Sequence, residues 1–400
     1  MTNRATLLRS RDSHARVTFV ELFFDLVFVF AVTQLSHTLL EHLTLAGALQ
    51  TAFLLLAVWW VWMYTCWFTN FIDPDKAPAR VLLFALMLAG LLMSASIPHA
   101  FDHEALLFGC AYAFSQVVRS LFMVRALRGH EPANYRNFLR ITSWLAVSAV
   151  FWVGGGWLGG AQQAWLWMIA LAIEFLGPIA LFYVPGLGAS ATSDWKIDGA
   201  HMAERCALFV IIALGESILV TGATAASQPA NASNVGAFVV AFLGSVAMWW
   251  IYFNIGAERG SRQLASSADP GRVGRAVYTY FHIPIVAGIV VCAVADEITI
   301  THSGGHLGIA EASVLLGGPA LYIGGNVFFK RASARYYPLS HLVGLGLLVL
   351  LAPVALYVTP LMLGAATTGV LLTVATWETR SFKTVPGRQT GISSGESSHH

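Results

Sequence analysis

The fold of this chain is decided by ELFFDLVFVFAVTQ at residues 21–34, an apolar stretch that has a counterpart, ERCALFVIIALGES, at residues 204–217. Each stretch contains two carboxylic acids: Glu21, Asp25, Glu204 and Glu216. A charged side chain at the centre of a bilayer costs roughly 2.5–3.5 kcal/mol on insertion scales. Four acids in two comparable stretches therefore indicate a functional site, unless they serve only to pack helices together.

The composition is that of a membrane protein. Of 400 residues, 56% are hydrophobic and 11% are charged, and the mean hydropathy is +0.66. Apolar stretches of about 20 residues, long enough to cross a bilayer as helices, recur from Val17 almost to the C-terminus. We therefore expect an all-α, polytopic integral membrane protein. The twelve expected transmembrane helices cover residues 17–40, 45–70, 80–98, 104–127, 137–157, 163–184, 202–225, 235–256, 274–297, 308–329, 338–357 and 360–378.

The loops between these helices alternate in charge. With the N-terminus inside, all loop arginines and lysines, Lys330 among them, fall on the inner side, where such residues are retained. The outer loops hold acids and histidines instead: Glu41, Asp102, Glu104, Asp296, Glu297, Glu311, His42, His99, His103, His302 and His306. This partition predicts a multi-pass protein with both termini in the cytoplasm. The basic face indicates contact with membrane lipids, and neither face indicates nucleic acid.

An internal repeat is visible when the expected helices are compared. The helix after residues 21–34 carries WWVWMY at residues 59–64, and the helix after residues 204–217 carries MWWIYF at residues 248–253. Because six helices per half is an even number, two such halves form a parallel repeat. The expected organisation is a cytoplasmic tail at 1–16, two six-helix halves at 17–184 and 202–378, a cytoplasmic loop at 185–201, and a disordered cytoplasmic tail at 379–400.

The embedded acids have few basic partners. Glu21 and Asp25 are four residues apart, so they share one face of a helix. The embedded bases at a comparable depth are Arg119 and Arg205. A two-fold repeat favours crossed pairing, of Glu21 or Asp25 with Arg205 and of Glu204 with Arg119.

Two bases leave most of the embedded acids uncompensated, to be protonated or to bind a cation. Glu174 and Glu216 lie deepest, and such acids are typical of a proton relay or a cation site. His282 and His341 are placed to extend such a relay. The alternative for all these groups is structural: ion pairs and hydrogen bonds that fix helix packing, with core histidines satisfied by their neighbours.

Aromatic residues gather near the cytoplasmic ends of two helices. One interpretation of Trp62, Trp250, Tyr252 and Asn254 is a cavity wall for a lipid, an isoprenoid or a quaternary cation. The other interpretation is an interfacial aromatic belt without a ligand.

Two histidine pairs in the outer loops have spacings compatible with metal binding, at His99 and His103 and at His302 and His306. Loops need not keep helical geometry and no cysteine supports either pair, so solvated loop residues are the favoured interpretation. We expect no metal and no cofactor.

The chain resembles the bacterial low-temperature requirement protein A family. The resemblance runs from about residue 17 to 378 and rests on VELFFDLVFVFAVTQLSH at 20–37, FIDPD at 71–75, ERCALFVIIALGESIL at 204–219 and WWIYFN at 249–254. It implies a polytopic protein of the bacterial cytoplasmic membrane with acids at these positions. The family name describes a growth phenotype, so the resemblance implies no substrate or reaction. Ile72 departs from the family pattern, in which a second polar residue is expected.

Three function classes remain open. The preferred one is a proton- or cation-coupled transporter, favoured by twelve helices, a repeat and surplus buried acids. A second is an intramembrane enzyme acting on a lipid or isoprenoid with a carboxylic acid as general acid, although no nucleophile elbow, HExxH or DDxxD-like motif is present. A third is a membrane-adaptation scaffold. The substrate and the oligomeric state are not predicted.

Overall fold

A computed structural model describes residues 7–9, 16–190, 198–254, 275–334 and 336–383, and these parts are almost entirely helical. Three short helices accompany the α-helices: the 3-10 turns η1 (Ile97–His99) and η4 (Ala352–Tyr357) and the π-helix η3 (Arg275–Tyr280). The α-helices are α1 (Phe19–Glu41), α2 (Leu45–Phe71), α3 (Ala77–Ala95), α4 (Ala105–Leu127), α5 (Pro132–Leu158), α6 (Gly160–Ile179), α7 (Gly199–Ser227), α8 (Ala232–Phe253), α11 (His282–Thr301), α12 (Ile309–Ala334), α13 (Leu339–Leu351) and α14 (Pro360–Lys383).

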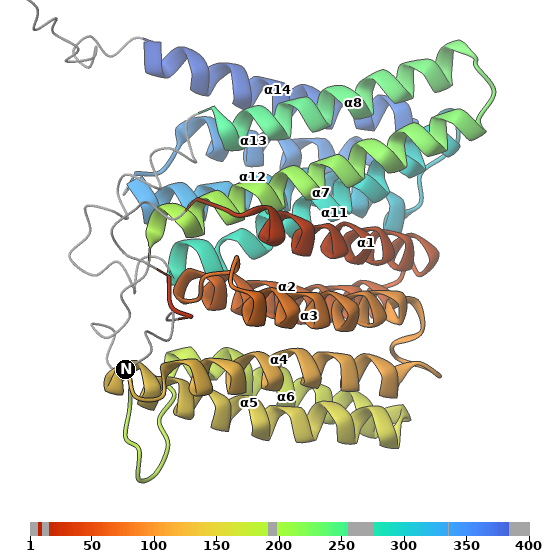
Figure 1. The fold of residues 1–400 in the computed structure, drawn as a ribbon. Coiled ribbons are helices and arrows are strands. Elements are labelled where there is room, and N and C mark those ends of the chain that lie inside the picture. Colours follow the sequence, from red (N-terminus) through yellow and green to blue (C-terminus); the bar gives the residue numbers. More distant parts are fainter. Residues whose placement is uncertain (1–6, 10–15, 191–197, 255–274, 335, 384–400) are drawn as a thin grey trace, which may run out of the picture.

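The helices run alongside one another as a bundle, and α1 begins at the end of the bundle where α14 finishes (Figure 1). Eleven spans in the described residues are long and apolar enough to cross a membrane, so the chain is a polytopic all-α membrane protein. The remaining α-helix, α6, is not among these eleven spans; it contains the polar residues Gln162, Gln163 and Glu174. The two-half repeat is not tested by this arrangement and stays a prediction.

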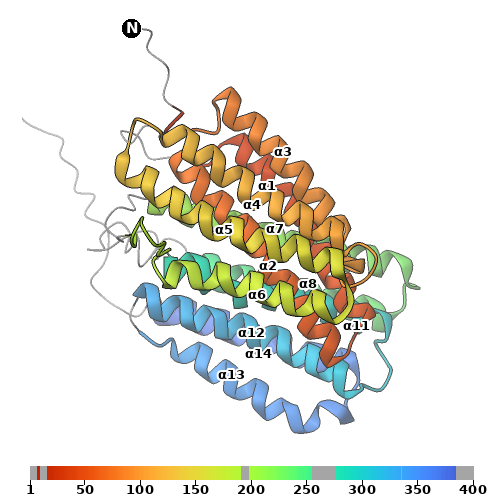
Figure 2. The ribbon, with the colours of Figure 1, turned by 90° about the horizontal axis from the view of Figure 1, so that it is seen from below.

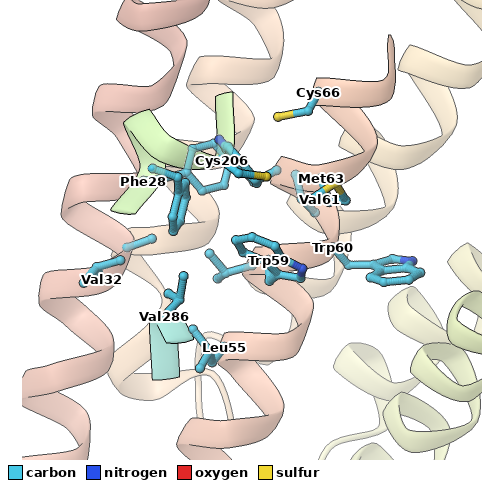
Figure 3. Close-up of a cluster of buried hydrophobic side chains, with 14 of the residues drawn as sticks. Phe28, Val32, Leu55, Trp59, Trp60, Val61, Met63, Cys66, Cys206 and Val286 are labelled. Carbon is cyan, nitrogen blue, oxygen red and sulfur yellow. The ribbon is translucent and has the colours of Figure 1, made fainter. Parts of the chain in front are cut away.

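The bundle has a centre and two flanks. Helices α4, α5 and α6 pack together on one flank, while α8, α13 and α14 lie on the other (Figures 1 and 2). Helices α1, α2, α7 and α11 meet between them. Figure 3 shows their shared core, which contains Phe28 of α1, Trp59 of α2, Cys206 of α7 and Val286 of α11. Trp60 points away from this core and stacks on Phe175 of α6, with ring centroids 4.0 Å apart.

Several helix ends differ from the sequence-based prediction. Helix α6 ends at Ile179 rather than at 184, because Pro178 interrupts its last turn and Leu181 and Phe182 adopt positive φ angles of 52° and 49°. Helix α11 continues to Thr301, so the expected outer-loop acids Asp296 and Glu297 are helical.

Two helix pairs approach closely through glycine. On α11, a Cβ added to Gly288 would lie 2.5 Å from the backbone nitrogen of Tyr322 on α12. On α4, a Cβ added to Gly109 would lie 2.5 Å from the backbone oxygen of Trp152 on α5. Small residues allow such contacts between membrane helices. These pairs fix the positions of the polar side chains described below.

Candidate functional site

Glu21 begins helix α1 as part of a capping box. Its carboxylate accepts hydrogen bonds from the backbone N–H of Thr18 at 2.9 Å and from the Thr18 hydroxyl at 3.0 Å. The spacing Thr-x-x-Glu before an apolar run is a sequence signal for this motif. Glu21 therefore has a structural role at the helix start in addition to any role in function.

Arg205 of α7 joins Glu21 to Asp25. Its guanidinium lies 3.3 Å from Glu21 and donates a hydrogen bond of 2.7 Å to Asp25, and all three side chains are buried. Trp62 of α2 donates a second hydrogen bond of 2.8 Å to the same Asp25 oxygen. The sequence favoured pairing of Glu21 or Asp25 with Arg205, and in the structure Arg205 contacts both.

His201, one turn before Arg205, completes the cluster and was not foreseen from the sequence. The backbone N–H of Asp198 donates to the side-chain oxygen of Asn70, which fixes the orientation of this amide. The amide NH₂ of Asn70 therefore faces His201 and donates to Nδ1 of the histidine at 3.2 Å. Nδ1 is therefore an acceptor and Nε2–H donates to Glu21 at 2.8 Å. Arg9 also contacts Glu21, at 3.3 Å, so two carboxylates face two guanidinium groups. This cluster is balanced without a bound cation.

The second half of the crossed pairing is wrong. Glu204 is exposed and accepts from the backbone N–H of Val17 at 3.3 Å, while Arg119 is buried in α4. Arg119 donates to the carbonyl of Val61, to the hydroxyl of Thr65 and to the side-chain oxygen of Gln116. Adjacent positions on a helix point about 100° apart, so the burial of Arg205 turns Glu204 away from the core.

Glu174 of α6 is held by four neutral hydrogen-bond donors. Tyr112 and Gln116 of α4 donate to one oxygen, both at 2.7 Å. Ser148 and Trp152 of α5 donate to the other, at 2.6 Å and 3.1 Å. Since the amide oxygen of Gln116 accepts from the Arg119 guanidinium, the glutamine links this carboxylate to a base. Such a network satisfies an ionised Glu174 completely.

A third charge cluster lies between α12, α13 and α14. Lys330 donates to both oxygens of Glu378, at 2.6 Å and 2.8 Å, and lies 3.1 Å from Nε2 of His341. Sequence reasoning placed Lys330 in a loop because the expected helix stopped at residue 329, whereas α12 continues to Ala334. His341 is therefore part of an ion-pair cluster.

His282 has both ring nitrogens occupied. It is buried, with Nδ1 3.0 Å from the carbonyl of Val277 and Nε2 2.8 Å from the hydroxyl of Tyr252. A carbonyl accepts only, so Nδ1 carries the proton and Nε2 accepts from the tyrosine. These contacts do not connect His282 to Glu174 or Glu216.

The four residues expected to form an aromatic cavity wall are not brought together. Trp62 and Tyr252 are buried and bonded to Asp25 and His282, as described above. Trp250 is 42% exposed, and its ring nitrogen and the side-chain amide of Asn254 both donate to the hydroxyl of Thr379, each at 2.9 Å.

Asp296 of α11 lines a cavity of about 20 Å³ between α8, α11, α12 and α14. The hydroxyl of Ser217 on α7 donates to it at 3.4 Å, and this is its one hydrogen bond within the described residues. Glu216, next to Ser217, is 4% exposed and makes no hydrogen bond or ion pair with the described residues. Asp296 was missed because it stands at the end of the expected helix 274–297 and was counted with the acids of the outer loop.

The outer-loop histidines do gather at one of the two expected places. The ligand atoms of His99, Asp102 and His103 lie within 4.8 Å of one another. All three side chains are exposed, so water competes for the same atoms, and we assign this cluster no role.

A bundle of apolar helices whose buried charges are matched across helices defines the chain as a polytopic membrane protein. More particularly, it belongs to the bacterial low temperature requirement A protein (LtrA) family, whose sequence profile matches residues 16–376. It is 40% identical over 373 residues to an uncharacterized protein of Rhizobium meliloti (strain 1021), a match that covers 93% of this chain and 91% of the relative. No solved structure matches it significantly.

Proposed function

We propose that this chain is a proton- or cation-coupled transporter of the bacterial cytoplasmic membrane, with both termini in the cytoplasm and with Asp296 and Glu216 as its coupling acids. The observation that carries the proposal is that Asp296 lines a cavity without a basic partner among the described residues. Asp296 is half-buried in the membrane-spanning helix α11, where a carboxylate without a base is costly unless it takes up a proton or a cation.

The other embedded acids have contacts that account for their charge. Arg205 and Arg9 neutralise Glu21 and Asp25, and Lys330 neutralises Glu378. Glu174 is satisfied by four donors. Of the embedded acids that the sequence predicted to lack a base, Glu216 is the one that is buried without a hydrogen bond or ion pair to the described residues. Asp296 is a further acid without a base among these residues.

The hydroxyl groups around Asp296 favour a cation over an anion. Thr299, Thr367 and Thr368 line the cavity, and each donates its hydroxyl hydrogen to a backbone carbonyl, of Ala295, Gly364 and Val240 respectively. A threonine hydroxyl has one hydrogen and two lone pairs, so these three oxygens have only acceptor capacity left for the cavity. Oxygen acceptors beside a carboxylate suit a small hard cation or a protonated acid. The cavity volume fits one such ion or a water molecule.

Uptake of the ion would change the charge at the contact between α7 and α11, where Ser217 reaches Asp296. A ligand that binds one arrangement of these helices more tightly than another shifts the protein toward it. In this account, ion binding at Asp296 changes the arrangement of α7 and α11 within the second six-helix half.

The test uses an apolar carbodiimide, which reacts with carboxylic acids in their protonated form. Purified full-length protein is treated at several pH values, with and without Na⁺, and the modified residues are mapped by mass spectrometry. We expect labelling at Asp296 that falls as the pH rises or as Na⁺ is added, and little labelling at Asp25, whose partner is Arg205. The proposal would be overturned if the extent of Asp296 labelling changed with neither pH nor Na⁺, or if Asp296 were not labelled at any pH.

A further inference from the structure

A second cavity, of about 80 Å³, lies between α2, α4, α5 and the end of α6. Its volume is several times the roughly 10–15 Å³ that one water molecule needs. Apolar side chains form most of its surface, including Trp60 and Trp67 of α2 and Phe138 of α5. This cavity is separate from the one at Asp296 and shares no lining residue with it.

Arg119 brings a positive charge to this apolar space. Its side chain is 2% exposed and lines the cavity, and no carboxylate of the described residues lies within ion-pair distance. A guanidinium has five N–H donors. Three of them have acceptors, at Val61, Thr65 and Gln116. The Nε–H and one Nη2–H therefore have no acceptor in the described part of the protein.

Further donors without partners line the same cavity. Trp60 Nε1, the Tyr64 hydroxyl and the Ser190 hydroxyl are buried polar atoms that make no hydrogen bond. A buried polar group without a hydrogen-bond partner is costly, so a ligand that satisfies several of them gains affinity. Tyr64 also lies beneath the Arg119 guanidinium, whose central carbon is 5.4 Å from the ring centroid. The polar part of the cavity is thus rich in donors, the opposite of the cavity at Asp296.

The charges nearby leave room for one negative charge. Glu174 is linked to Arg119 through Gln116, which balances one base with one acid. Arg140, 8% exposed and one residue before the cavity-lining Ile141, donates to the carbonyl of Leu187 and to Asn137 but forms no ion pair with the described residues. Among the described residues, two arginines therefore face one carboxylate in this region.

We propose that this cavity binds an apolar carboxylate, with its carboxylate at Arg119, Tyr64 and Ser190 and its hydrocarbon part against Trp60, Trp67 and Phe138. A carboxylate offers about four lone-pair sites and one negative charge, which match the unpartnered donors and the local charge. A phosphate dianion would exceed that charge. The proposal concerns binding alone, so it holds whether or not Asp296 couples transport to an ion.

Binding is measured by calorimetry on the full-length protein in lipid nanodiscs, with octanoate as the probe and octan-1-ol as its uncharged counterpart. We expect octanoate to bind about tenfold or more tightly than octan-1-ol, as hydrogen bonds to a charged group imply. Arg119→Gln should abolish this preference. Equal binding of the two compounds by the wild-type protein would overturn the proposal.

Arg119→Gln also removes contacts between helices, so a milder variant keeps the test independent of folding. Tyr64→Phe removes only the unpartnered hydroxyl, and we expect octanoate binding to weaken by about five- to tenfold. Tyr278→Phe is the matched control, because the Tyr278 hydroxyl is also buried without a partner but does not line this cavity. Equal octanoate affinity of Tyr64→Phe and Tyr278→Phe would contradict the assigned site.

The carboxylate has two sources that the same protein preparation distinguishes. Native mass spectrometry of protein extracted directly from membranes should show a bound fatty acid, lost in Arg119→Gln, if the membrane supplies the ligand. If a water-soluble acid is the ligand, the extracted protein should be empty and should gain benzoate from solution. Protein that is empty on extraction and takes up neither octanoate nor benzoate would overturn the proposal.

Discussion

Asp25 of α1 and Arg205 of α7 are joined by a hydrogen-bonded ion pair of 2.7 Å, with both side chains fully buried. The pair connects the first helix of the chain to the helix with which the expected second half begins. Trp62 of α2 donates to the same oxygen of Asp25, so three helices meet at one carboxylate. This contact orients the centre of the bundle, around which both cavities lie.

Removing Arg205 should destabilise the protein strongly. Arg205→Met leaves Glu21 and Asp25 buried with Arg9 as their remaining base, and breaking a buried ion pair on one side costs about 3–5 kcal/mol. We expect a marked fall in the melting temperature of the purified protein. Combining Arg205→Met with Asp25→Asn should recover part of the loss. A melting temperature of Arg205→Met equal to that of the wild type would refute a structural role for the pair.

Lys330 and Glu378 should behave in the same way. Lys330→Met leaves a buried carboxylate without its base, so we expect a loss of about 3–5 kcal/mol in stability. Lys330→Met combined with Glu378→Gln should lose less than Lys330→Met alone, because the uncompensated charge is gone. Thermal unfolding of the two variants checks this order, and the reverse order would contradict it.

Gly288 should not tolerate a side chain. A Cβ there would lie 2.5 Å from the backbone of Tyr322, so Gly288→Ala forces α11 and α12 apart. We expect a loss of at least about 1 kcal/mol, as overpacking typically costs. Gly324→Ala is the control, since a Cβ at Gly324 meets no atom within 4 Å. Melting temperatures that fall equally in both variants would contradict the assigned helix contact.

The sequence was sufficient for the class of fold and for one partner of the central ion pair. Run length and the loop charges predicted twelve helices, and the four-residue spacing of Glu21 and Asp25 predicted a shared face toward Arg205. The number of helices follows from hydropathy and loop charge along the chain, and the shared face of Glu21 and Asp25 follows from their spacing on one helix. Both are encoded directly in the sequence.

The rest depended on contacts between helices, which hydropathy does not encode. Asp296 and Lys330 were counted with loops because the expected helices stopped at residues 297 and 329, whereas α11 and α12 continue to Thr301 and Ala334. Glu174 was expected to lack a partner because the sequence reasoning counted charged residues only. Its four hydrogen-bond donors are neutral and do not enter such a count. The proposed coupling site therefore keeps Glu216 from the first four acids and adds Asp296.

The central claim, ion coupling at Asp296, is tested most directly by proton flux in proteoliposomes. Vesicles containing the full-length protein and a pH-sensitive dye are given gradients of Na⁺, K⁺ or Li⁺, and the luminal pH is followed. We expect at least one cation gradient to drive proton movement in the wild type and in Glu297→Gln, the neighbouring control on α11, but not in Asp296→Asn. Flux in Asp296→Asn equal to that of the wild type, or no cation-driven flux in the wild type, would contradict the account.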